Sequence, residues 1–110
     1  MHIGDLDRSS TLQPGDWTAI VTITVHDANH NLVVNATVTG AWSNGASGTA
    51  SCITGSNGRC SVSLSGISKS QSSVTFTVNN VTRAASTYTS ASNHDPDGDS
   101  NGITIIVARP

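Results

Sequence analysis

The chain has 110 residues, enough for one domain with a single core, and its formal net charge is −2. It carries only five Lys and Arg, against seven aspartates and no glutamate. Because nucleic acids and anionic membranes attract clustered Lys and Arg, this composition argues against both as partners, and no apolar run is long enough to cross a membrane.

We expect residues 1–110 to form a single domain. The polar sequence directly after Met1 gives no secretory leader, so the chain is expected to be an excised domain or a mature fragment. Scarce lysine and a surface rich in Ser, Thr, Asn and Gly favour a secreted, extracellular protein.

Apolar and polar residues alternate with period two through most of the chain. The clearest segment is 17–25, which predicts a long strand with one buried face, followed by a turn over 27–31. Residues 36–42 repeat the pattern, and Asn44-Gly45 is a hairpin signal.

Further strands are expected over 49–54, 59–64, 74–78, about 84–90 and 103–107. No helical period is visible, and the three prolines stand outside the strands. Short strands separated by regular turn signals predict an all-β fold, an antiparallel β-sandwich.

Two cysteines, Cys52 and Cys60, flank a segment of turn-forming residues. We expect the flanks to form a hairpin in which the two cysteines lie opposite each other, at a separation that a disulfide can bridge. Closing this short loop would stabilise the fold by about 2.5 kcal/mol in the chain-entropy model. The alternative is two free thiols; a metal site on them is not expected, because no histidine pair accompanies them at finger spacing.

An acidic segment precedes the last strand and reads D-x-D-x-N-G from Asp97, which is the first half of a calcium loop. Asp97, Asp99 and Asn101 would be ligands, and Gly102 would allow the sharp turn. The closing glutamate is missing, because Ala108 stands in its place. Calcium takes six to eight oxygens, so other carboxylates must complete the shell, and the candidates are Asp95, Asp5 and Asp7. A solvated acidic turn without an ion is the alternative.

Three segments, Val21–Asn29, Asn35–Val38 and Thr54–Val62, resemble the strand, "D-x-N" turn, "A-T-V" strand and "T-x-x-x-G" hairpin of bacterial immunoglobulin-like domains. The resemblance covers about two thirds of the chain and implies an immunoglobulin-like sandwich of about seven to eight strands. The whole chain also resembles accessory domains of secreted bacterial hydrolases, among them small calcium-containing carbohydrate-binding modules of cellulases. That resemblance implies a parent catalytic domain as a partner.

The expected function is non-catalytic binding of a β-glucan such as cellulose, a cello-oligosaccharide or a related plant polysaccharide. Aromatic rings lying flat on the surface would stack on the sugar, and a charge-poor face suits a neutral polysaccharide. The candidate rings are Trp42 and Tyr88, with Trp17 as a weaker candidate. Each has a structural alternative: Trp17 as a core residue between the sheets, Trp42 as a buried strand end, and Tyr88 as packing at a sheet edge.

The other function classes are a structural immunoglobulin-like spacer of a secreted enzyme or surface protein, a protein-binding domain and an enzyme. Catalysis is not expected, because the aspartates are grouped in turns and no nucleophile signature appears. The four histidines, His2, His26, His30 and His94, fall in turns or on the outward phase of strands and are interpreted as surface residues.

Overall fold

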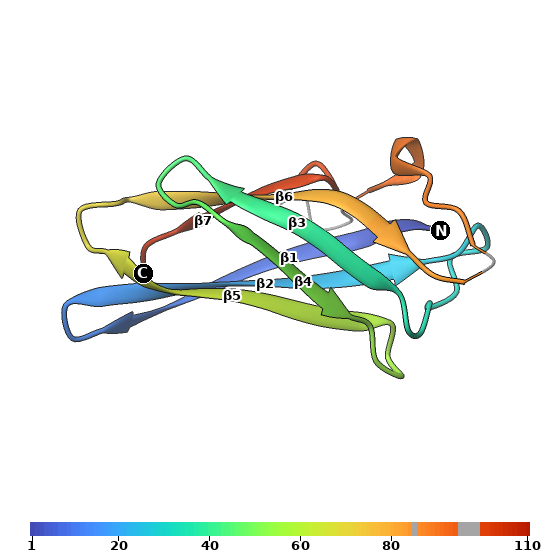
Figure 1. Ribbon diagram of the computed structural model, residues 1–110, viewed down its shortest axis with the longest axis horizontal. Helices are drawn as coiled ribbons and strands as arrows, with labels where there is room; N and C mark the ends of the chain where they lie inside the picture. Colours follow the sequence, from blue (N-terminus) through green and yellow to red (C-terminus); the bar gives the residue numbers. More distant parts are fainter. Residues whose placement is uncertain (85, 95–99) are drawn as a thin grey trace.

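A computed structural model describes residues 1–84, 86–94 and 100–110. Seven antiparallel strands in these residues form two packed sheets, so the expected immunoglobulin-like β-sandwich is confirmed (Figure 1). The domain is elongated, with principal extents of 44 × 23 × 21 Å. No helix among the described residues has the length and apolar character needed to span a membrane.

The first sheet has three strands in the order β1-β2-β5: β1 (His2–Gln13), β2 (Asp16–His26) and β5 (Arg59–Ser68). The central strand β2 carries the alternation seen in the sequence, and its inward residues Trp17, Ala19, Val21, Ile23 and Val25 are all fully buried. β1 pairs with it along its whole length, apart from a bulge between Ile3 and Asp5.

The second sheet has four strands in the order β4-β3-β6-β7: β3 (Thr37–Ser43), β4 (Thr49–Ile53), β6 (Ser73–Thr82) and β7 (Thr104–Ala108). Trp42 and Phe76 are paired across β3 and β6, with ring centroids 5.0 Å apart. Gly40 leaves the room that Phe76 needs, because a Cβ there would lie 2.4 Å from the Phe76 ring. These side chains fill the space between the sheets.

The two sheets are joined at both edges. Cys52 of β4 and Cys60 of β5 form the predicted disulfide, with Cα atoms 5.8 Å apart. The expected hairpin is wrong, because β4 pairs with β3 while β5 pairs with β2 in the other sheet. The turn between the cysteines therefore crosses from one sheet to the other, and the disulfide links the sheets. At the opposite edge, the side chains of Arg8 and Ser10 donate hydrogen bonds to β7 carbonyls.

Two strand predictions differ from the structure. β1 was not expected as a strand, since its bulge and polar second half break the alternation that would have indicated it. The strand expected at about 84–90 is absent: the described residues there are coil, followed by a short 3-10 helix, η1 (Ser90–Ser92). This segment is too rich in Ser and Thr to offer a buried face, and it crosses one end of the sandwich instead (Figure 1).

Candidate metal centre

Four histidines from separate segments meet at the end of the sandwich where the chain begins. His2 opens β1 and His26 ends β2, and the two are direct partners in the antiparallel ladder. His30 lies in the turn after β2, and His94 follows η1. We call His2, His26, His30 and His94 the histidine cluster. The interpretation as surface residues is wrong for His2, which is only 4% exposed. It holds for His30, which is exposed, whereas His26 and His94 are half-buried.

The geometry of the histidine cluster is compact. All six pairs of ring centroids are separated by 5.2 to 5.9 Å. One ring nitrogen from each side chain can be chosen so that all four lie within 4.8 Å of one another. No carboxylate or thiol among the described residues belongs to this group, so its donors are imidazole nitrogens alone.

Asp27 fixes the turn that returns His30 toward His26. Its carboxylate accepts hydrogen bonds of 2.9 Å from the backbone N–H groups of Asn29 and Asn31. These bonds to the charged form lower the pKa of Asp27, so the carboxylate stays ionised. His30 itself has a φ of 62°, in the left-handed region that brings the chain back on itself.

Asn93 attaches the segment that carries His94 to β1. Its side-chain oxygen accepts a 2.7 Å bond from the Ile3 N–H, and the His94 N–H donates to the Ile3 carbonyl at 3.1 Å. The Asn93 amide in turn donates to the Tyr88 hydroxyl at 2.6 Å. A chain of hydrogen bonds and one peptide bond therefore connects Tyr88, through Asn93, to His94.

Gly4 lets the His26 ring lie against β1. A Cβ at this position would meet the ring at 2.2 to 2.6 Å, closer than any side chain tolerates. The bulge at Gly4 also keeps His2 and His26 in register at the end of the ladder. The absence of a side chain at residue 4 is thus a condition for the cluster.

Burial and repulsion between imidazoles lower the pKa of two of the rings and so favour their neutral form. The pKa of His2 is lowered first by burial and then by the neighbouring imidazoles of His94 and His30. The pKa of His26 is lowered by the same causes in the same order, partly opposed by the Asp27 carboxylate. Neutral imidazole carries a free lone pair, which is the form that binds a metal ion.

The residues expected to bind a glycan do not form a common face. Trp17 is fully buried, and its indole N–H donates to the carbonyls of Ser68 and Gln71. Trp42 is 4% exposed and packs on Phe76. Neither ring face can stack on a sugar, which corrects the expectation for both tryptophans. Tyr88 is half-buried, with its hydroxyl engaged by Asn93.

The structure describes only part of the expected calcium site. Asp95, Asp97 and Asp99 lie outside the described residues. Asn101 uses its side-chain oxygen to accept bonds from the N–H groups of Ile103 and Thr104, and Gly102 has the expected left-handed φ of 83°. Asp5 and Asp7 lie on β1, opposite Thr24 and Thr22. Calcium binding by these residues stays a prediction.

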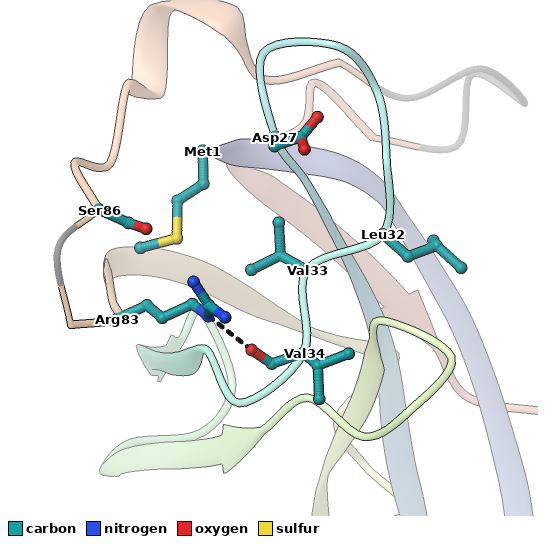
Figure 2. A pocket seen from close by; sticks show the side chains of 7 residues that line it. All are labelled: Met1, Asp27, Leu32, Val33, Val34, Arg83 and Ser86. Carbon is teal, nitrogen blue, oxygen red and sulfur yellow. Dashed lines mark hydrogen bonds between the residues drawn. The ribbon is translucent and has the colours of Figure 1, made fainter.

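A hollow of about 350 Å³ is lined in part by Met1 and Asp27, the chain neighbours of His2 and His26. Figure 2 shows the Met1 side chain extending toward Ser86 and Arg83, whose guanidinium donates to the Val34 carbonyl at 2.8 Å. None of its lining residues is aromatic, so the hollow offers no ring on which a sugar could stack.

The sequence contains one local signal for the cluster. His26 and His30 are separated by three residues, a spacing found in zinc sites. The other two histidines stand near opposite ends of the chain. Pairing of β1 with β2 places His2 beside His26, and the Asn93 contacts place His94 beside β1.

A comparison with family models finds one match. The model of the bacterial Ig-like domain, group 1, matches residues 9–91 of the chain. The matched segment includes His26 and His30 but neither His2 nor His94. No curated protein and no solved structure matches the chain.

Proposed function

Because the chain belongs to the group 1 bacterial Ig-like domains, we propose that it is a structural spacer in a secreted or surface-exposed bacterial protein. The family is a non-catalytic one, and its members occur in extracellular and surface proteins of bacteria. A disulfide agrees with an oxidising compartment, because cytosolic proteins rarely keep one.

The observation that carries this proposal is the position of the two chain ends. The N-terminus and the C-terminus lie toward opposite ends of the long axis of the sandwich (Figure 1), which measures 44 Å. A domain entered at one end and left at the other holds its neighbours apart by its own length. A domain whose two ends lie side by side would not increase the distance between its neighbours in the chain.

The joined edges suit this role. A spacer transmits force between its ends, and a sandwich resists it best when its sheets cannot slide apart. Here the disulfide links one pair of sheet edges, and Arg8 and Ser10 link the other pair through hydrogen bonds to β7.

Small-angle X-ray scattering on one, two and three copies of the chain joined head to tail tests the proposal. We expect the maximum dimension to grow by roughly one domain length, 44 Å, with each added copy. Compact particles whose dimension grows much less would contradict the spacer role.

Affinity gels containing cellulose or xylan separate this function from β-glucan binding. With Trp17 and Trp42 buried, we expect the chain to migrate in these gels as it does in a gel without polysaccharide. Retardation that Tyr88→Ala abolishes would favour a carbohydrate-binding module attached to a catalytic domain.

A further inference from the structure

The proposed spacer function gives the histidine cluster no role. We propose that His2, His26, His30 and His94 together bind one divalent transition-metal ion, Zn²⁺ by preference, through one ring nitrogen each. The proposal does not rest on the spacer function, and two of the four ligands lie outside the segment that the family model matches.

The arrangement of the rings is tetrahedral. Four points can have six nearly equal separations only if they sit at the corners of a tetrahedron, and the six centroid separations are 5.2 to 5.9 Å. In a square, the diagonal separations would be about 1.4 times the edges, as the square-planar sites of Cu(II) or Ni(II) require. Tetrahedral coordination by four protein ligands is the geometry of a structural zinc site.

The dimensions also agree with zinc. A Zn–N bond of about 2.0 Å puts an imidazole centroid about 3.2 Å from the ion, so tetrahedral ligands have centroids about 5.2 Å apart. The observed separations begin at that value. The donor nitrogens lie within 4.8 Å of one another, and ideal coordination needs about 3.4 Å. Each ring would move inward by less than about 1 Å, which small side-chain rotations supply.

Two buried imidazole nitrogens of the cluster lack a hydrogen-bond partner among the described residues. Nε2 of His2 and Nδ1 of His26 are inaccessible to solvent and have no hydrogen-bond partner in the described part of the chain. A buried polar atom without a partner destabilises the fold, so such atoms are rare unless a ligand uses them. An ion at the centre of the cluster would accept these lone pairs.

The chemistry of the donors selects the class of ion. Imidazole suits zinc and its neighbours among the transition metals, whereas calcium and magnesium prefer oxygen. The carboxylate of Asp27, next to His26 in the chain, accepts hydrogen bonds that hold the turn. The donor set of the cluster therefore differs from the oxygen ligands expected for calcium at the acidic segment.

Metal binding would tie together segments that are far apart in sequence. The ion would connect the start of β1, the end of β2, the turn after β2 and the residue after Asn93, which closes a loop between His2 and His94. An ion that binds only the folded state stabilises that state by mass action, so Tm should rise with the ion concentration.

Calorimetric titration of untagged, metal-depleted protein with ZnCl₂ tests the proposal, and the absence of a histidine tag is essential. We expect one ion per chain and a rise in Tm on loading. Co²⁺ should give the intense visible bands of a tetrahedral site, and excess Ca²⁺ should not remove them.

The variants His30→Ala and His94→Ala should each weaken zinc binding at least tenfold, by loss of one ligand. His30 is exposed, so its replacement is not expected to unfold the chain. Asn29→Ala is the matched control, because it changes an exposed side chain of the same turn and keeps the N–H that Asp27 holds. Absence of stoichiometric zinc binding, or equal affinity in all three variants and the parent, would overturn the proposal.

Discussion

In the body of the sandwich, Trp17, Val21 and Phe76 are fully buried among other apolar side chains, and burial of apolar area holds them there. At the histidine end, four polar rings meet with two nitrogens that have no partner among the described residues. Burial of apolar area stabilises the body, whereas our proposal has a metal ion complete the histidine end. If the proposal holds, substitutions in the two regions should change stability and metal binding separately.

Trp17→Ala should give the largest loss in the free energy of unfolding, and this loss should come from the body of the sandwich. The substitution removes a fully buried ring and two hydrogen bonds, so we expect a loss of about 3–5 kcal/mol in the free energy of unfolding. Urea denaturation measures this loss. The control is Thr22→Ala, on the outward side of the same strand, which loses only a hydrogen bond to Ser61 and should cost about 1 kcal/mol.

Zinc affinity of the folded fraction should be unchanged in Trp17→Ala, because Trp17 and His26 are about 30 Å apart along β2. A loss of less than 1 kcal/mol would show that the body does not depend on this ring. A large fall in zinc affinity would show that the two regions are coupled.

Replacing both cysteines by alanine should lower the free energy of unfolding by about 2.5 kcal/mol, through loss of the link between the two sheets. Denaturation with and without a reducing agent provides the control. The reductant should destabilise the parent chain by the same amount and leave the double variant unaffected. Equal stability of the oxidised and reduced parent would mean that the disulfide contributes nothing.

Gly4→Ala should affect the histidine end more than the body. The new methyl group would push on the His26 ring, so we expect a loss of about 1–3 kcal/mol from overpacking and a drop in zinc affinity of at least tenfold. Gly55→Ala is the matched control, because a Cβ there meets no atom closer than 3.8 Å. Unchanged zinc affinity in Gly4→Ala would show that the ring is not held where we place it.

Tyr88→Phe should have the smallest effect. It keeps the aromatic ring and removes the hydroxyl that accepts the Asn93 bond, so we expect a loss of about 0.5–1.5 kcal/mol together with weaker zinc binding. Melting curves recorded with and without zinc separate the two effects. If stability falls while zinc affinity does not, Tyr88 has no positioning role toward His94.

The body was predictable from the sequence because its signal is local. The alternation over 17–25 needs only neighbouring residues, and it located both the strand and its buried face. Even the Cys52–Cys60 bridge follows from the short spacing of the cysteines, although the sequence could not reveal that the turn between them changes sheets.

The histidine end was not predictable in the same way, because its contacts are long-range. His2 and His94 are 92 positions apart, and no periodicity connects them. Trp42 shows the converse error: its small neighbours suggested exposure, but those neighbours, Gly40 above all, are what allow the aromatic rings to pack inside.

X-ray absorption at the zinc edge, on zinc-loaded and untagged protein, tests the central claim most directly. We predict four nitrogen ligands at about 2.0 Å with the outer-shell scattering of four imidazoles, and three imidazoles in His94→Ala. A shell containing sulfur at about 2.3 Å, or one of oxygen ligands without imidazole scattering, would contradict the assignment of the histidine cluster as the metal centre.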